Sequence, residues 1–244
     1  MSNAGLMEIR GKHFQYSQKL SNGSNSIEEK EKKKAKVVPS KTGMIVLYTP
    51  AFLAGVLSFF IFPIGAADLR FTLVRLAVTA HFCKRVLEVL FLHKFSGSMN
   101  IKDMIAISLS YFTFSAMTIY AQYLTTSLSE PIIDLKYVGV SMFLLGIGGN
   151  FYHHYLLSKL RTSGDKQYKI PQGGLFGIVI CPHYLFEIIG FWGMSCISQT
   201  LYPLCFTMGT TFYLMGRSYA TRKWYESKFE DFPKDVKAVL PFIY

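Results

Sequence analysis

The stretch GMIVLYTPAFLAGVLSFFIFPI at residues 43–64 decides the fold, because it contains no charged side chain. At a rise of about 1.5 Å per residue, a helix of this length crosses a hydrocarbon core of about 30 Å. Half of the 244 residues are hydrophobic and 16% are aromatic, yet the formal net charge is +11. A soluble domain of this size can build its core from a less apolar sequence. The stretch therefore predicts a membrane span.

Working outward from it, five further apolar segments follow at 71–92, 104–126, 137–157, 176–198 and 201–216. We therefore predict an all-α fold, a polytopic transmembrane helical bundle of about six spans. The sixth segment is short, and we expect it to be tilted or partly interfacial. From Arg217 onward we expect a charged and aromatic tail outside the membrane.

The basic residues are divided unevenly between the two sides that alternating spans would create. One side would carry 21 Lys and Arg residues, and the other only Arg70 and Lys136. Cytosolic loops of membrane proteins carry the excess of Lys and Arg, so we expect both termini to be cytosolic. The predicted domains are a basic cytosolic N-terminal segment, N-terminal transmembrane helices, and a C-terminal domain with a cytosolic tail, at 1–42, 43–135 and 136–244.

All four cysteines lie inside apolar stretches, and no C-x-x-C pair is present. This pattern is typical of small buried apolar residues and does not match a disulfide framework or a zinc site. We predict no bound metal. The four are Cys83, Cys181, Cys196 and Cys205.

The second segment carries many ionisable residues for a membrane span. On a helix, His81, Arg85 and Glu88 fall on one stripe, and Lys84 lies one turn before Glu88 and can pair with it. Ionisable groups inside a bilayer face a bundle interior, a cavity or one another. The stripe fits an internal ion-pair network that fixes helix packing. It also fits a polar wall in which Arg85 holds the phosphate of an anionic cofactor.

A second polar stripe lies on the fourth segment, where Asn150, His154 and Arg161 share one helix face. Arg161 is expected at the cytosolic end of this helix. Asn150 and His154 are suited to hydrogen-bond either a nicotinamide carboxamide or a neighbouring helix.

The run GIGGN at 146–150 contains glycines but lacks the strand–turn–helix setting and the third glycine of a dinucleotide fingerprint. We expect its glycines to let helices approach closely. They are Gly146, Gly148 and Gly149.

The loop TSGDKQYKIPQGG at 162–174 is basic and is broken by glycine and proline. It fits a phosphate cradle and an ordinary connector equally well. In the fifth segment, His183 and Glu187 lie one helical turn apart, and we expect a hydrogen bond between them. Two such side chains do not make a metal site. A third ligand would have to come from His153 or His154.

Two motifs resemble the C-terminal domain of the steroid 5α-reductase family, particularly plant 3-oxo-5α-steroid 4-dehydrogenase-like members: YKIPQGGLFGIVICPHYLFE at 168–187 and RSYATRKWYESKFEDFPKDVKAVLPFIY at 217–244. A third, HFCKRVLEVLFLHKFSGSM at 81–99, is similar to the very-long-chain enoyl-CoA reductase branch of the same superfamily. With the spans between them, the motifs cover the chain from about residue 4 to residue 244. The family has seven transmembrane helices, so the resemblance implies that the first is missing here.

The resemblance implies an NADPH-dependent oxidoreductase that reduces a carbon–carbon double bond conjugated to a carbonyl group. It also implies a lipid substrate, steroid or enoyl-CoA, in the bilayer of the endoplasmic reticulum, and no nucleic-acid partner. Steroid reductases carry asparagine at the position of His183 and aspartate at that of His154. Matched by position, the cofactor-binding residues are Arg85, Asn150, His154, Arg161, Tyr168, His183, Glu187, Arg217 and Tyr225.

The substrate end departs from the family pattern. Steroid reductases use a glutamate and a tyrosine to hydrogen-bond the substrate carbonyl, and the tyrosine position is Phe82 here. The glutamate position aligns near Tyr48, whose phenol could replace the lost donor. We therefore predict Tyr48 as the catalytic, polarising group. Alternatively, Tyr48 sits at the membrane interface, as tyrosines often do.

Three other functions are compatible with the sequence. One is a very-long-chain trans-2-enoyl-CoA reductase, and another is an isoprenylcysteine-type membrane methyltransferase with a basic C-terminal cofactor site. S-adenosylmethionine lacks phosphates, so the arginine cluster favours a pyrophosphate dinucleotide over it. The third is a non-catalytic relative that retains the cofactor site.

Overall fold

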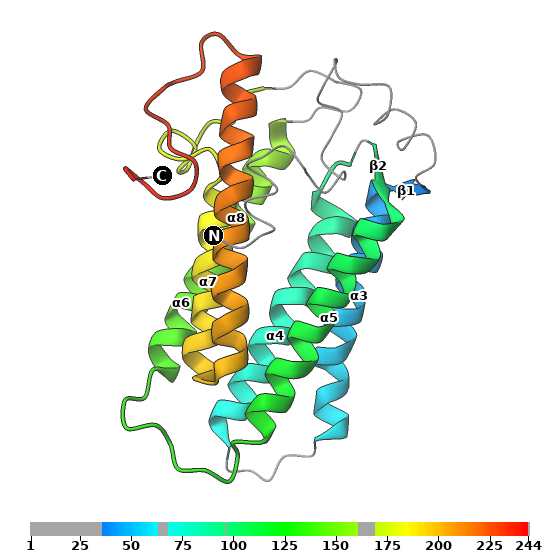
Figure 1. Cartoon of the computed structure of the whole chain (residues 1–244), viewed down its shortest axis with the longest axis vertical. Helices are drawn as coiled ribbons and strands as arrows, with labels where there is room; N and C mark the ends of the chain where they lie inside the picture. The colour runs from blue at the N-terminus through cyan, green and yellow to red at the C-terminus, as the bar shows by residue number, and fades with distance from the viewer. Residues whose placement is uncertain (1–35, 63–67, 96, 161–168, 244) are drawn as a thin grey trace.

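A computed structural model describes residues 36–62, 68–95, 97–160 and 169–243, and these residues are mostly helical. Its long helices run along the longest axis of the molecule and alternate in direction (Figure 1). A short antiparallel pair of strands, β1 and β2, joins the starts of α3 and α5. In chain order the elements are β1 (Val37–Pro39), α3 (Ser40–Ile61), α4 (Leu69–Leu87), the π-helix η2 (Glu88–Leu92), β2 (Ser98–Asn100), α5 (Ile101–Tyr123), α6 (Lys136–Leu160), α7 (Pro182–Ser198) and α8 (Leu201–Lys228).

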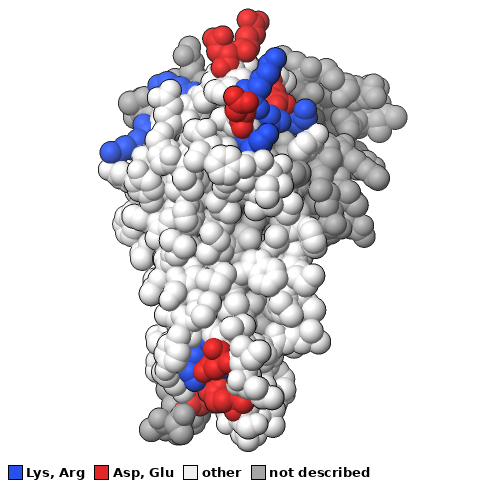
Figure 2. Space-filling view, turned by 90° about the vertical axis from the view of Figure 1, so that its left-hand side faces the viewer, with Lys and Arg blue, Asp and Glu red and all other residues white. Residues whose placement is uncertain are grey.

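The helical fold predicted from the apolar segments is confirmed. Among the described residues, α3 and α5 are long and apolar enough to cross a membrane by length and composition. Figure 2 shows the described charged side chains at the two ends of the viewed face, with an uncharged band between them. This distribution is compatible with a membrane bundle, while the number of spans, six, stays a prediction.

Two predicted segments have wrong boundaries. The sixth does not end near residue 216, because α8 continues to Lys228 and carries the first part of the expected tail as helix. The fifth does not begin at residue 176, because α7 starts only at Pro182. Proline fits the first turn of a helix, and its ring pushes the preceding residue out of the helical region. Upstream, Gly173 and Gly174 have φ values of 85° and 53°, which break any helix before it.

Side-chain caps explain where two of the helices begin. Asp68 accepts a hydrogen bond from the Phe71 amide at 2.8 Å, and Asn100 accepts one from the Lys102 amide at 2.9 Å. Each cap satisfies one of the four amide groups that a helix start leaves without a partner. Such caps typically contribute about 1 kcal/mol. The starts of α4 and α5 are therefore encoded locally.

The end of α3 is held by a buried arginine from α4. The Nη1 atom of Arg75 donates to the carbonyl oxygens of Ser58, at 3.3 Å, and Phe62, at 3.0 Å. The guanidinium carbon lies 4.6 Å from the Phe59 ring centre and 4.3 Å from that of Phe71. A cation at the negative end of a helix, covered by aromatic faces, is electrostatically favourable. Arg75 therefore links α3 to α4.

A second arginine, Arg70, organises the end of the bundle that carries the residue 124–135 connection. Its side chain reaches Glu130 at 2.5 Å, Asp134 at 2.6 Å and the Ile197 carbonyl oxygen at 2.7 Å. The Lys136 amide and ammonium, together with Arg70, lower the pKa of Asp134 to about 2. Asp134 is therefore ionised at neutral pH and keeps its ion pairs. This cluster ties α4, the connection and the end of α7 together.

Glycines bring α6 and α7 into close contact, as predicted for two of the three in the 146–150 run. A Cβ atom on Gly146 would lie 2.5 Å from the Gly190 backbone, and one on Gly149 would lie 2.2 Å from the Phe186 ring. Gly148 has no described atom within 4 Å of that position, so the packing role predicted for it is wrong. Backbone approach of this kind is typical of small residues at membrane helix interfaces.

The helices form two groups of three, α3–α5 and α6–α8, which meet where α4 packs on α7 and α5 packs on α8. One hydrophobic core joins them, since Phe82 of α4 and Phe114 of α5 belong to the same buried cluster as Phe191 of α7. The division of the chain near residue 135 into two domains stays a prediction.

Candidate active site

Tyr48 on α3 and Arg85 on α4 make the contact at the centre of the candidate site. The Nη2 atom of Arg85 donates a hydrogen bond to the Tyr48 hydroxyl oxygen. The guanidinium carbon also lies 4.7 Å from the centre of the Tyr48 ring. Tyr48 is only 4% exposed, so its ring lies inside the bundle and not on its outer surface. Because its oxygen accepts from Arg85, its own O–H remains able to donate to another group.

Glu88, the first residue of the π-helix, joins this arginine to a lysine and a histidine. Its carboxylate lies 2.9 Å from Lys84 Nζ, 3.4 Å from Arg85 Nη1 and 3.1 Å from His154 Nδ1. A carboxylate that is 2% exposed would be costly without such partners. The predicted Lys84–Glu88 pair and the predicted internal ion-pair network are confirmed.

Among the residues that the structure describes, His81 makes no ion pair with this network, although helical spacing placed it on the same stripe. Its ring contacts Phe82 at 4.9 Å and Phe191 at 5.0 Å, between ring centres. Phe82 in turn contacts Tyr111 at 5.5 Å. An aromatic layer therefore lies directly beside the polar network.

The polar face predicted for α6 is confirmed for its described residues. Asn150 accepts from Lys84 Nζ and donates to the His183 carbonyl oxygen at 2.8 Å. The His154 ring lies 5.4 Å from the His183 ring. The side-chain amide of Asn150 thus links α4 to α7. Of its two predicted roles, this is the hydrogen bond to a neighbouring helix.

The expected hydrogen bond between His183 and Glu187 is not among those of the described residues. His183 Nδ1 is buried and finds no partner there, and Glu187 is 7% exposed. The buried ring atom of His183 and the buried side chain of Glu187 lie one helical turn apart on α7.

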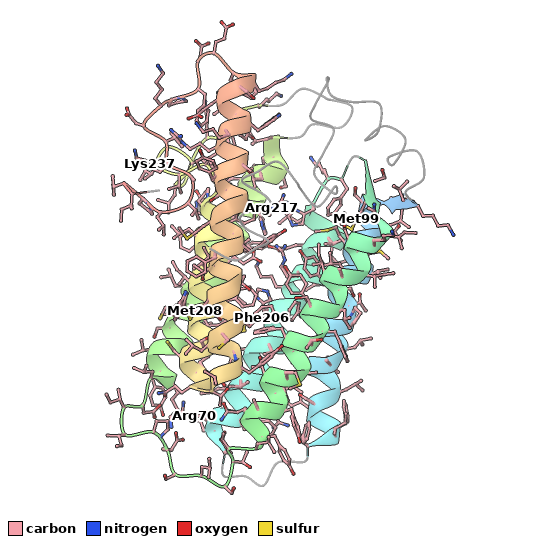
Figure 3. The ribbon with its side chains drawn as sticks, in the orientation of Figure 1. Arg70, Met99, Phe206, Met208, Arg217 and Lys237 are labelled. Atoms are coloured by element: carbon pink, nitrogen blue, oxygen red, sulfur yellow. The ribbon has the colours of Figure 1, made fainter. Side chains whose placement is uncertain are left out.

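Arg217 and Tyr225 lie on α8, farther along the same end of the bundle. Figure 3 labels Arg217 on the half of α8 opposite to Phe206. Arg217 is 7% exposed, so its side chain lies mostly inside the protein. Tyr225 stacks on Phe229, with ring centres 5.7 Å apart.

Arg217 and Tyr225 lie about two helical turns apart on α8. The predicted cofactor residues Arg161 and Tyr168 lie outside the described residues. Next to them in sequence, a hollow of about 440 Å³ is lined by Leu160, Lys169, Ile170, Gln172 and Phe229.

His93 also lies beside Glu88 and His154. A regular helical period did not predict this position. The η2 turn makes an i,i+5 hydrogen bond of 2.8 Å from the His93 amide to the Glu88 carbonyl oxygen. It places the His93 ring 4.8 Å from that of His154. Ligand atoms of Glu88, His93 and His154 lie within 4.8 Å of one another, which is compact enough for a metal ion. Lys84 and Arg85 already neutralise Glu88, and their charges disfavour a divalent cation there.

His153 has a structural role. The sequence had suggested it only as a possible metal ligand. Its Nδ1 bonds to the Gly149 carbonyl oxygen at 2.7 Å, and its Nε2 accepts from the Leu175 amide at 3.1 Å. The chain fits closely here, because a Cβ atom on Gly174 would lie 2.6 Å from that Nε2. His153 therefore fastens the segment before α7 to α6.

Comparison with known proteins adds the family. The family profile described as 3-oxo-5-alpha-steroid 4-dehydrogenase matches residues 98–244. The steroid 5-alpha-reductase DET2 of Gossypium hirsutum is 43% identical over 107 residues, which are 43% of this chain and 42% of that protein. The 3-oxo-5-alpha-steroid 4-dehydrogenase 2 of Sus scrofa is 37% identical over 126 residues, 51% and 50% of the two chains.

The very-long-chain enoyl-CoA reductase of Dictyostelium discoideum is 32% identical over 166 residues, 67% of this chain and 55% of that protein. The chain thus spans about half the length of the curated relatives it matches. The family profile covers more than half of the chain, including four of its long helices. The chain therefore belongs to the 3-oxo-5-alpha-steroid 4-dehydrogenase family.

Proposed function

We propose that this chain is an NADPH-dependent membrane oxidoreductase that reduces a carbon–carbon double bond conjugated to a carbonyl in a lipid, as a 3-oxo-5α-steroid 4-dehydrogenase does. One observation carries the proposal. A buried cation, Arg85, contacts the Tyr48 hydroxyl on one side and Glu88 and His154 on the other. The same helix presents Phe82 to an aromatic layer. Polar and apolar groups thus meet where a lipid carbonyl would have to be held.

The fit of NADPH to this site rests on buried polar atoms. Arg85 Nε and His183 Nδ1 are both buried and lack hydrogen-bond partners among the described residues. Buried groups of this kind are normally satisfied, so a ligand with polar atoms would complete them. A nicotinamide carboxamide offers both a donor and an acceptor. Arg85, Asn150, His154, His183 and Glu187 are the residues we assign to the cofactor here.

Arg217, Tyr225, Arg161 and Tyr168 would hold the phosphates and the adenosine. The hollow lined by Leu160, Lys169 and Phe229 lies next to Arg161 and Tyr168 in sequence, and we assign it to the nucleotide end. A buried arginine matches the geometry of phosphate better than a lysine does. NADPH, when bound, supplies the hydride that the reduction requires.

In the proposed mechanism, Tyr48 polarises the substrate carbonyl. Its oxygen accepts from Arg85, which leaves the phenolic proton to donate and makes it a better donor. As negative charge develops on the carbonyl oxygen, a preorganised donor in a dry site stabilises it more than water would. Glu88 and His154 hold the guanidinium in place. The resulting enolate would then take a proton from water at its α-carbon.

We also propose that all six long helices cross the membrane of the endoplasmic reticulum, with the Lys228 end of α8 facing the cytosol. The uneven distribution of Lys and Arg supports this orientation. Asp235→Cys in the tail and Ile132→Cys in the opposite connection are both exposed positions for labelling. In intact microsomes, a membrane-impermeant maleimide should label only the first above the background of the unmodified chain. Labelling of Ile132→Cys before detergent is added would contradict the orientation.

The function itself is tested by NADPH oxidation in microsomes containing the protein. A 3-oxo-Δ4-steroid, a trans-2-enoyl-CoA and a polyprenyl enone form the panel, and equilibrium binding of NADPH and S-adenosylmethionine is measured alongside. We expect NADPH binding and turnover of the steroid. Binding of S-adenosylmethionine alone would favour the methyltransferase, and NADPH binding without any turnover would favour a non-catalytic relative.

A second candidate, very-long-chain trans-2-enoyl-CoA reduction, is favoured by one observation. The Dictyostelium discoideum relative of that name matches more of this chain, 67%, than the two steroid reductases do. Both reactions need a polarised carbonyl and a hydride, so the same residues serve either. Turnover of the enoyl thioester but not of the steroid would select this candidate.

A further inference from the structure

Tyr111 on α5 is a second tyrosine that faces the centre of the candidate site. The inward face of α5 consists of residues at helical spacing, Ser108, Tyr111, Phe114 and Thr118. The side chain of Tyr111 is half-buried, and the other three are buried. Its outward neighbours on the same helix, including Tyr120 at 47%, are exposed. The position of Tyr111 is therefore fixed by the packing of α5 against α3 and α4.

The ring contacts of Tyr111 join the polar network to the aromatic layer. It stacks on Tyr48, with ring centres 5.7 Å apart and planes 23° apart. It also lies 5.5 Å from the ring of Phe82. The Tyr48 hydroxyl accepts from Arg85, so Tyr111 stacks directly on a phenol that is bound to this guanidinium.

A carbonyl oxygen has two lone pairs, and negative charge on it is best held by two donors arriving from different directions. Tyr48 supplies one. Phe82, which contacts Tyr111 from α4, has no polar atom and is fully buried. Tyr111 contacts the rings of both Tyr48 and Phe82, so α5 brings a second phenol to the same place.

We propose that the Tyr111 hydroxyl is the second hydrogen-bond donor to the substrate carbonyl, and that Tyr48 and Tyr111 together form the pocket for the developing oxyanion. The inference rests on the proposed reduction of a conjugated carbonyl. Neither phenol is consumed, because each only shares its proton with the oxygen while the carbon–carbon double bond is reduced. The ligand class is a lipid with a carbonyl at the boundary between the charged and the aromatic layers.

The test compares Tyr111→Phe with Tyr120→Phe, a matched control on the same helix that is exposed. With saturating NADPH, Tyr111→Phe should lower kcat by roughly 10²-fold, since removal of one such donor costs about that much. The KM for the substrate should change little, and Tyr120→Phe should match the wild-type protein. Wild-type kcat in Tyr111→Phe would overturn the inference while leaving the proposed reduction intact.

A second readout does not need turnover. Difference infrared spectroscopy with a carbonyl-13C-labelled enone should place the bound carbonyl band lower in the wild type than in Tyr111→Phe, because donors weaken the carbonyl bond. Adding Phe82→Tyr to Tyr111→Phe puts a phenol against the same rings and should restore part of kcat and of the band shift. An identical band in the wild type and Tyr111→Phe overturns the donor role. A wild type that neither turns over nor shifts the band of any enone overturns the inference and the proposed function together.

Discussion

Replacement of Tyr48 by phenylalanine is expected to lower kcat by roughly 10²–10³-fold, the range found when one oxyanion donor is removed. The ring and its stacking on Tyr111 survive the change, so the fold should persist. What is lost is the hydroxyl that accepts from Arg85 and would donate to the carbonyl. Steady-state NADPH oxidation with the preferred substrate measures the effect, and equilibrium binding should show unchanged NADPH affinity.

The control for this change is Tyr137→Phe, which removes a phenol that is 65% exposed at the far end of α6. It should keep wild-type kcat and wild-type NADPH affinity. If Tyr48→Phe turns over as fast as Tyr137→Phe, then Tyr48 does not polarise the substrate. A joint loss of NADPH binding and turnover in Tyr48→Phe would instead assign it to cofactor binding.

The largest expected change in stability is that of Gly146→Ala. The added Cβ would lie 2.5 Å from the Gly190 Cα and N atoms and 2.8 Å from the Phe186 carbonyl oxygen. These are backbone atoms of α7, so no side-chain rotation relieves the overlap, and α6 and α7 must separate. Overpacking of this kind costs about 1–3 kcal/mol. A chain of this length loses about 2–4 °C of Tm per kcal/mol, so thermal unfolding in detergent should detect it.

Gly148→Ala is the matched control, because none of the described atoms lies within 4 Å of the added Cβ. It should leave Tm unchanged or raise it, since alanine favours a helix by about 1 kcal/mol over glycine. Equal melting of the two variants would show that α6 and α7 do not approach as closely as the structure has them.

The sequence was sufficient for the helices and their order, because long apolar runs and period-3.6 stripes are local signals. It misjudged α8, since the charged residues beyond Arg217 looked like a tail although none of them breaks a helix. It also placed the start of α7 too early. Residues 176–181 are apolar like the helix that follows, but the positive φ angles of Gly173 and Gly174 and the ring of Pro182 keep the chain out of a helix there.

The candidate site was predictable where it lay on single helices, as for Lys84 with Glu88 and for Asn150 with His154. Contacts between helices were not predictable from one helix period. His81 and Glu88 share one stripe of α4 and its continuation, yet they contact different groups. His81 packs against the aromatic ring of Phe191 on α7. The role of His93 depends on the π-turn of η2, which alters the helical period.

Tyr111 carries no sequence signal at all, because its neighbours Tyr48 and Phe82 belong to other helices. The roles predicted for Arg161 and Tyr168 fall outside the described residues. These roles stay predictions.

The Arg70 cluster has a mechanical consequence. It joins the start of α4 to Glu130 and Asp134 in the connection and to the Ile197 carbonyl at the end of α7. Both groups of three helices are therefore held together at that end. Toward the other end, Lys84 with Asn150 and Glu88 with His154 hold α4 and η2 to α6. A lipid that entered between the two groups would have to separate charged contacts at one of these two places, whereas the aromatic layer between them offers only apolar contacts.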